Sequence, residues 1–320
     1  MRQLLAALRK TIWPQLFAIV SLYGLGVLTI NGSGTWRSVL AVCVLASFVG
    51  IAAAGQTVVA LLGGIDLAIP GVIAFANIAT AQLTGDHWPF WIVAPSILIL
   101  SAAVGAFNGA ISKSFNINPL IVTLGVSAIL TGAILVWTGG QPTGYAPKWL
   151  NGFVAPSGTT FGLPLPPVLV FWGVVAILLV VLLRGTVFGK HVYASGASLP
   201  AADLALVPTT RVWTLAFALS GIMAAITGIL LAGFTTQGDP RIATPYLFNT
   251  IASVVIGGTS LVGARGGYLR TVLGAVILTE ITTLLVANSF SAATQQVLLG
   301  AIILAVVATY GREQAVSDRL

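Results

Sequence analysis

The sequence predicts an all-α fold: a polytopic membrane helix bundle of about ten transmembrane helices with both termini in the cytoplasm. Charged residues make up 7% of the 320 residues and hydrophobic residues 57%, whereas soluble domains carry roughly 25% charged residues. Apolar runs of about 20 residues, long enough to cross about 30 Å of hydrocarbon, recur along the whole chain. Runs this long and uniformly apolar are unlike barrel strands, so the spans are expected to be helical.

The spans can be justified in chain order. Basic residues precede the first apolar run, as in a signal peptide, but no convincing small-residue cleavage site follows, so this run is interpreted as a retained first helix. Pro70 interrupts the third run, and Gly257-Gly258 with the glycine cluster 263–267 interrupts the eighth. Irregular backbone at this depth is tolerated where it is buried in protein or lines a cavity. The predicted spans lie near residues 14–31, 38–62, 67–84, 90–112, 118–138, 167–183, 213–233, 249–263, 271–288 and 295–310.

The distribution of basic residues predicts the orientation. Cytoplasmic connections carry an excess of Lys and Arg. With the N-terminus inside, the outer segments hold only Arg37, Lys148 and Arg241. The inner segments hold the other eleven basic residues: Arg2, Arg9, Lys10, Lys113, Arg184, Lys190, Arg211, Arg265, Arg270, Arg312 and Arg319.

We expect residues 1–320 to form a single transmembrane permease domain. Two connections are longer than the usual few residues: residues 139–166, predicted outside, and residues 184–212, predicted inside. A long cytoplasmic connection in a permease is a natural docking surface for a partner, and the alternative is a plain connector.

Several function classes are excluded on the residues. The net charge of +7 does not indicate nucleic-acid binding, because the basic residues stand one or two at a time between spans. His87 and His191 are far apart and Cys43 is the only cysteine, so neither a metal site nor any other cofactor is expected. Residues 184–191 do not match a phosphate loop, because the spacing of their glycines differs from that motif and no Ser or Thr follows the lysine. We therefore predict that the chain is not an enzyme.

Two glycine signatures stand out among the spans. Gly63, Gly64 and Asp66 form the first, and Gly257 and Gly258 form the second. The nine residues around each are similar, which indicates either an internal repeat or chance. Asp66 lies where it can cap the helix that follows, and we favour that structural role over direct contact with a solute.

Polar side chains inside the spans are the candidates for a solute path. An isolated charge at mid-bilayer costs on the order of 3 kcal/mol or more, so Glu280 either lines the path or is a protonated or helix-bridging carboxyl group. Many neutral polar residues in spans simply bond neighbouring helices. The candidate path residues are Asn77, Gln82, Asn108, Asn249, Glu280, Thr282 and Thr283.

Three stretches match a known family in the same order along the chain. Residues 63–68 are similar to its Gly-Gly-x-Asp-Leu-Ser segment, residues 105–125 to its Asn-Gly and Pro-Phe-Ile-Val-Thr-Leu-Gly segments, and residues 251–266 to its most specific stretch. Over most of its length the chain resembles the permease subunits of bacterial ABC importers for ribose, xylose and related sugars. These lie in the superfamily shared with branched-chain amino acid permeases.

The resemblance implies a multi-pass protein of the bacterial inner membrane that works with a periplasmic solute-binding protein, a second permease subunit and a separate ATP-binding subunit that hydrolyses ATP. It also implies that residues 194–202 form the coupling segment, a short helix seated in a groove of the ATPase. The coupling residues are then Ala194, Ser195, Gly196, Ala197, Ser198, Leu199, Ala201 and Ala202.

The chain departs from the family pattern at some of these positions. The family usually has Asn at the position of Ser198, a basic residue at Asp203 and Gly at Leu206, which leaves the ATPase partner open. Its paired asparagines appear here as Thr282 and Thr283, which leaves the solute open.

The function implied is a path for a monosaccharide or similar small polar solute from periplasm to cytoplasm. Two alternatives remain: a permease for branched-chain amino acids or another small solute of the superfamily, and an ion-coupled secondary transporter with Glu280 as its coupling residue.

Overall fold

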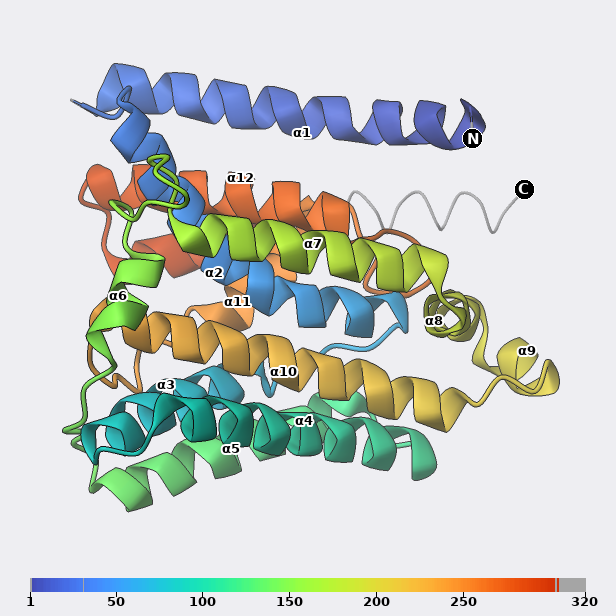
Figure 1. Ribbon diagram of the computed structural model, residues 1–320. Coiled ribbons are helices and arrows are strands. Elements are labelled where there is room, and N and C mark those ends of the chain that lie inside the picture. The colour runs from blue at the N-terminus through green and yellow to red at the C-terminus, as the bar shows by residue number, and fades with distance from the viewer. Residues whose placement is uncertain (1, 31, 303, 305–320) are drawn as a thin grey trace.

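The chain folds into a bundle of helices (Figure 1). The computed structural model describes residues 2–30, 32–302 and 304. No β-strand forms in these residues, which contain only two isolated β-bridges. A last helix covers Ala292–Ile302. The others are α1 (Arg2–Thr29), α2 (Trp36–Leu61), α3 (Ile69–Gly85), α4 (Phe90–Ser114), α5 (Pro119–Thr138), α6 (Lys148–Val154), α7 (Pro167–Gly185), α8 (Val187–Ala197), α9 (Leu199–Leu204), α10 (Thr209–Thr235), α11 (Tyr246–Ile256) and α12 (Tyr268–Ala287).

Seven helices in the described part of the chain are long and apolar enough to cross a membrane: α1 over Ile12–Thr29, α2, α4, α5, α7, α10 and α12. The protein is therefore a multi-pass helical membrane protein. The other three predicted spans coincide with shorter apolar helices, namely α3, α11 and Ala292–Ile302. The predicted tenth span, 295–310, extends beyond the described residues, so the count of ten remains a prediction.

The predicted eighth span, 249–263, is wrong in its second half. Helix α11 has 11 residues and ends at Ile256, so it rises only about 17 Å of the roughly 30 Å of hydrocarbon. Residues 257–267 turn back instead of continuing the helix, because Gly258, Gly263 and Gly266 adopt positive φ angles of 78°, 108° and 129°. We call residues 257–267 the second break, and residues 62–68, between α2 and α3, the first break.

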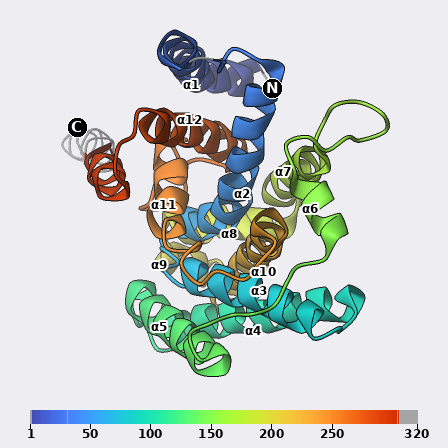
Figure 2. The same ribbon diagram turned by 90° about the vertical axis from the view of Figure 1, so that its left-hand side faces the viewer.

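Helix α10 is the centre of the bundle. Its main packing partners are α4, α3 and α2, and Figure 2 shows it between α2 on one side and α3 and α4 on the other, with α1 and α5 at opposite margins. Small residues allow backbones to touch at these crossings. A Cβ atom at Gly105 would overlap the Phe217 carbonyl group, and one at Gly221 would overlap the Ser101 carbonyl group. Close approach through small residues is typical of helix packing in membranes.

The two ends of the bundle differ in their connections (Figure 1). Helices α8 and α9 lie at one end together with the start of α1, and we call this the α8–α9 end. The opposite end holds α6, and we call it the α6 end. The connections place Arg37, Lys148 and Arg241 at the α6 end. Besides Arg2, Arg9 and Lys10 of α1, the basic residues placed at the α8–α9 end are Lys113, Arg184, Lys190, Arg211, Arg265 and Arg270. Arg312, Arg319 and the C-terminus lie outside the described residues, so their cytoplasmic location stays a prediction.

The contact between α4 and α10 predicts a stability difference between two glycine-to-alanine changes. Gly105→Ala forces two backbones apart and should cost about 1–3 kcal/mol, which lowers the midpoint of thermal unfolding in detergent. Gly173 on α7 has no atom within 4 Å of a Cβ, so Gly173→Ala is the matched control. It should leave the midpoint unchanged or raise it, since alanine favours the helix. Equal midpoints for the two variants would contradict the backbone contact.

Candidate functional site

The two breaks and the end of α8 meet at the α8–α9 end. The amide of Ala264 donates a hydrogen bond of 3.0 Å to the carbonyl oxygen of Leu61, the last residue of α2. Gly196 of α8 lies against the same oxygen, which a Cβ at this position would overlap. The Tyr193 hydroxyl donates to the Gly266 carbonyl at 3.1 Å. Burial raises the pKa of Tyr193, so this hydroxyl stays protonated as a donor. The end of α8 is thus held against both breaks.

Both breaks begin with the same helix-ending turn. Gly63 and Gly258 have φ angles of 80° and 78°, the left-handed conformation that glycine adopts without steric cost. The amides that follow, of Gly64 and Thr259, each donate at 3.0 Å to a carbonyl five residues back, which is the Schellman motif. The sequence similarity pairs Gly63 with Gly257, whereas the turns pair Gly63 with Gly258. A shared way of ending a helix therefore accounts for the glycines without an internal repeat.

A buried carboxylate organises the first break. Asp66, only 4% exposed, accepts hydrogen bonds from the Ala68 amide at 2.9 Å and from the Ser220 hydroxyl of α10 at 2.7 Å. The Asp66 amide in turn donates to the side chain of Gln56 on α2 at 3.2 Å. Asp66 thus pairs the backbone just before α3 and ties α2 and α10 to this break. Its role is structural, but it is not the predicted cap, because the N-cap of α3 is Ala68 and no side chain bonds there.

The expected coupling segment forms a corner, because it contains the end of α8, Ser198 and the start of α9. The expectation of one short helix is therefore corrected. The Ser198 backbone is extended, and its hydroxyl accepts from the Ala201 amide at 3.4 Å, so Ser198 ends one helix and caps the next. Within the segment, Ser195 and Ala202 are buried and Gly196 and Leu199 are half-buried. Its exposed members are Ala194, Ala197, Ser198, Pro200 and Ala201.

Helix α9 is anchored where the chain departs from the family pattern. Asp203 forms an ion pair with Lys113 of α4, 3.6 Å from Nζ to the carboxylate, and accepts a 2.6 Å hydrogen bond from Thr209 at the start of α10. Leu206 stands in the left-handed conformation, with φ of 57°, which explains why glycine suits this position. Leu204 and Leu206 are 86% and 90% exposed, so this end presents an apolar surface outside the membrane-length helices.

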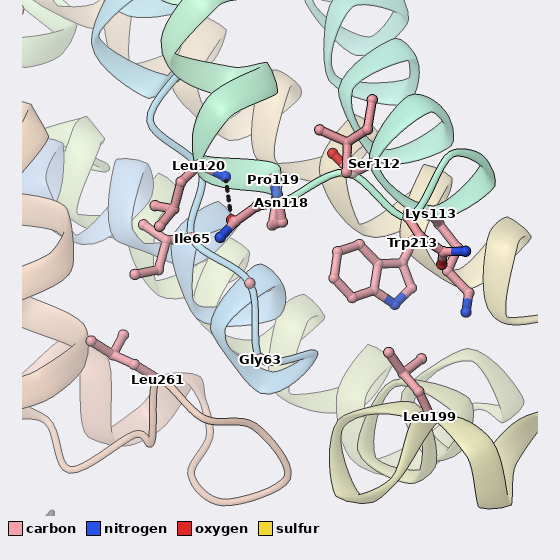
Figure 3. A pocket seen from close by; sticks show the side chains of 13 residues that line it. Gly63, Ile65, Ser112, Lys113, Asn118, Pro119, Leu120, Leu199, Trp213 and Leu261 are labelled. Carbon is pink, nitrogen blue, oxygen red and sulfur yellow. Dashed lines mark hydrogen bonds between the residues drawn. The ribbon is translucent and has the colours of Figure 1, made fainter.

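A cavity of about 430 Å³ lies beside this junction (Figure 3). It brings together the first break, the end of α4, the start of α5, the coupling segment and the second break. In Figure 3, Ser112, Lys113 and Trp213 lie on one side, Ile65, Asn118 and Leu120 on another, and Leu199 and Leu261 below. The full lining is Gly63, Gly64, Ile65, Ser112, Lys113, Asn116, Ile117, Asn118, Pro119, Leu120, Leu199, Trp213 and Leu261.

Two candidate path residues on α3 face the connections of the α6 end. Asn77 is fully buried and accepts from the Asp239 amide at 2.8 Å. Gln82 accepts from the Thr143 amide at 3.4 Å. Both side chains therefore hold connections in place at that end of the bundle.

The remaining candidates lie on three helices. Asn108 on α4, Asn249 on α11 and Glu280 on α12 each have a buried side-chain atom without a hydrogen-bond partner among the described residues. Glu280 and Thr283 line an apolar groove of about 530 Å³ that α12 forms with α1 and α2. None of the other five candidates lines this groove. The Thr282 hydroxyl is occupied by the carbonyl groups of Leu278 and Thr279. One protomer thus does not gather the seven candidates into one path.

Sequence reasoning named Gly63, Gly196 and Leu199 but missed other residues of the junction and its cavity. Trp213 reads as an aromatic residue at the membrane–water interface, where tryptophan is common. Ser112 and Tyr193 carry no motif. The one usable signal was Lys113, a single basic residue in a short turn between two predicted spans.

The chain matches the family described as branched-chain amino acid transport system / permease component over residues 38–307. No solved structure matches it. Among curated relatives, the ribose import permease protein RbsC of Haemophilus influenzae is 30% identical over 230 residues, 71% of each chain.

Two further relatives have comparable identity over a larger share of the chain. The L-arabinose transport system permease protein AraH of Escherichia coli is 32% identical over 263 residues, 82% of this chain and 78% of its own. The autoinducer 2 import system permease protein LsrC of Shigella flexneri is 31% identical over 274 residues, 83% and 77% respectively. The expected relationship to bacterial importer permeases is confirmed, and the chain belongs to the family of branched-chain amino acid transport system permease components.

Proposed function

We propose that this chain is the transmembrane permease subunit of an ABC importer that carries a monosaccharide or similar small polar solute into the cytoplasm. The observation that carries the proposal is the packing of the coupling segment against Leu61 and Ala264, in a chain whose relatives import ribose and arabinose. The family description keeps branched-chain amino acids as the second candidate solute. Glu280, the candidate for ion coupling, lies in a groove with α1 and α2, away from the junction.

In this proposal the α8–α9 end faces the cytoplasm and the α6 end faces the periplasm of a bacterial inner membrane. The sorting of basic residues between the two ends supports that orientation. A separate ATP-binding subunit docks on the exposed side of the coupling segment and on Leu204 and Leu206, and hydrolyses ATP. A periplasmic solute-binding protein docks at the α6 end.

In this proposal, movement of the ATPase reaches the membrane helices through direct backbone contact. A displacement of the corner at Ser198 reaches the Leu61 carbonyl through Gly196, since no side chain separates the two backbones. From there it acts on both breaks, where turns join α2 to α3 and α11 to α12. Turns change direction through a few backbone dihedral angles, whereas a packed helix moves as a unit.

A second permease subunit completes the path in this proposal. Helix α5 buries only Thr123 and Ile134 and leaves Ile121, Ile129 and Val136 at 68%, 69% and 85% exposed. Such a face suits either lipid or another subunit. The unpartnered amides of Asn108 and Asn249 are the groups we place nearest to a passing solute, because buried amides require hydrogen-bond partners.

The importer mechanism predicts that the purified chain, co-expressed with its ATPase and reconstituted in lipid, hydrolyses ATP faster when a sugar-loaded binding protein is added. Branched-chain amino acids on their own binding protein are the comparison for the second candidate solute. Transport of solute by the chain alone, down an ion gradient and without any ATPase, would overturn the proposal.

The exposed face of the coupling segment predicts that Ala197→Arg weakens association with the ATPase about thirtyfold, since disrupting a central interface residue costs roughly 2 kcal/mol. The variant should insert normally but lose uptake. Co-purification of the ATPase subunit measures the association. Ala292, an exposed alanine outside the α8–α9 end, is the control, and Ala292→Arg should leave co-purification unchanged. Normal uptake by Ala197→Arg would refute this placement of the coupling surface.

The contact between Gly196 and Leu61 predicts a separation of docking from transport. In Gly196→Ala the new Cβ displaces α8 from the end of α2 while the exposed face stays intact. The variant should keep the ATPase bound and its ATP hydrolysis active, yet import little solute. Gly185→Ala, whose Cβ would meet only Val181 at an ordinary 3.8 Å, should behave like the unchanged chain. Full uptake by Gly196→Ala would show that the contact transmits nothing.

A further inference from the structure

The cavity at the α8–α9 end contains hydrogen-bond donors that the described residues leave without partners. Trp213 and Ser112 are 6% and 3% exposed, and both the indole nitrogen Nε1 and the Ser112 hydroxyl lack a partner in the described structure. An indole N–H can only donate. Buried polar groups are normally paired, and an unpaired one costs about 1–3 kcal/mol. Two such groups in one cavity wall point to an occupant that supplies acceptor atoms.

A positive charge stands beside these donors. The Lys113 side chain is 15% exposed, and its Nζ lies 3.6 Å from Asp203, a contact that engages one of three ammonium protons at most. Asp203 also accepts from Thr209, so the carboxylate has a second donor of its own. Figure 3 shows Lys113, Ser112 and Trp213 on the same side of the cavity.

The opposite side adds further donors. The Asn118 side-chain oxygen accepts from the Leu120 amide at 3.0 Å, a bond drawn in Figure 3, which leaves the Asn118 amino group as a donor. Helix α5 begins at the next residue, Pro119, and the amino end of a helix carries partial positive charge. The lining therefore offers one cation and several donors, which is the chemistry of an oxyanion site.

We propose that this cavity binds the phosphoryl group of a cytoplasmic ligand, with Lys113, Trp213 and Ser112 as its main contacts. The volume of about 430 Å³ falls within the roughly 300–1,000 Å³ of small-molecule sites. The apolar side chains of Ile65, Leu199 and Leu261 enclose the remainder of the ligand. A sugar phosphate meets both requirements, and so does the headgroup of an anionic phospholipid from the inner leaflet.

Occupancy has a consequence for transport that rests on the proposed function. Leu199 belongs to the coupling segment and Gly63 to the first break, and both line the cavity. A ligand between them holds the two in their present spacing, so it opposes the displacement that coupling requires. The bound phosphoryl compound is then an inhibitor of import, of the kind that a phosphoryl-transfer step consuming the imported solute would produce.

Binding can be tested on the full chain without any partner protein. The chain is placed in phosphatidylcholine nanodiscs and titrated with ribose 5-phosphate, inorganic phosphate or ribose by calorimetry. We expect ribose 5-phosphate to bind and ribose not to bind. Trp213→Phe, which keeps the ring against Phe217, and Lys113→Met should each weaken binding about tenfold or more. The matched controls are Trp91→Phe and Lys190→Met, which change exposed residues outside the cavity and should leave binding unchanged.

The outcomes distinguish a soluble phosphate compound from a lipid headgroup, and they test the phosphoryl site separately from the proposed importer function. Loss of ribose 5-phosphate binding in phosphatidylglycerol at high ionic strength, where repulsion by the charged bilayer surface is screened, supports the phosphoryl site and assigns it to an anionic lipid headgroup. Absence of binding, equal binding of ribose, or binding unaffected by both Trp213→Phe and Lys113→Met would overturn the site. In the assembled transporter, ribose 5-phosphate should slow stimulated ATP hydrolysis, and Lys113→Met should remove that inhibition. Failure of import with intact binding counts against the proposed function alone.

Discussion

The structure depends on the direct backbone contact between α10 and its neighbours. Lipid tails are as apolar as leucine side chains, so helices in a membrane associate by close packing and polar contacts. Here α10 meets α4 at Gly105 and α3 at Gly228, and α2 meets it at Gly55, each a position where a Cβ would clash with the neighbouring helix. The same crossings set Ser220 beside Asp66 and bring Trp213 to the wall of the cavity. The position of α10 therefore decides the geometry of the first break and of the candidate site.

The breaks solve a second problem, which is how to interrupt a helix without leaving backbone groups unpaired in an apolar environment. In the first break, Asp66 and Gln56 serve backbone amides, and Thr123 of α5 accepts from the Leu67 amide at 3.0 Å. In the second, the Leu61 carbonyl serves Ala264. Because α8 rests on the same carbonyl group, the least regular backbone at this end is also the part closest to the coupling segment. In the proposed transporter, that arrangement gives an ATPase on the exposed side a short route to the membrane helices.

The departures from the family pattern are consistent with one another. Asp203, where the family usually has a basic residue, is paired with Lys113 and Thr209, so the change of sign is absorbed within the chain. Leu206 stands where glycine would relieve a left-handed backbone, and in exchange it adds an exposed apolar side chain to the docking end. Both changes alter the surface next to the coupling segment and leave the contact at Gly196 intact. In the proposed transporter, these two changes bear on the choice of ATPase more than on the transmission of movement.

The helical class, the membrane location and the position of each of the seven membrane-length helices follow from the sequence alone, because apolar run length and glycine or proline interruptions act locally along the chain. The residue stretches that resemble the family also led to the predicted coupling segment, whose role stays a prediction and whose corner at Ser198 was not foreseen. Tertiary structure decided which face each polar residue presents. Asn77 and Glu280 look alike as polar residues in apolar runs, yet one holds a connection at the α6 end and the other lies in a groove beside α1. Only the fold could bring Gly63, Trp213 and Leu261 to one cavity, since helix packing, and not sequence spacing, sets distances between residues so far apart in the chain.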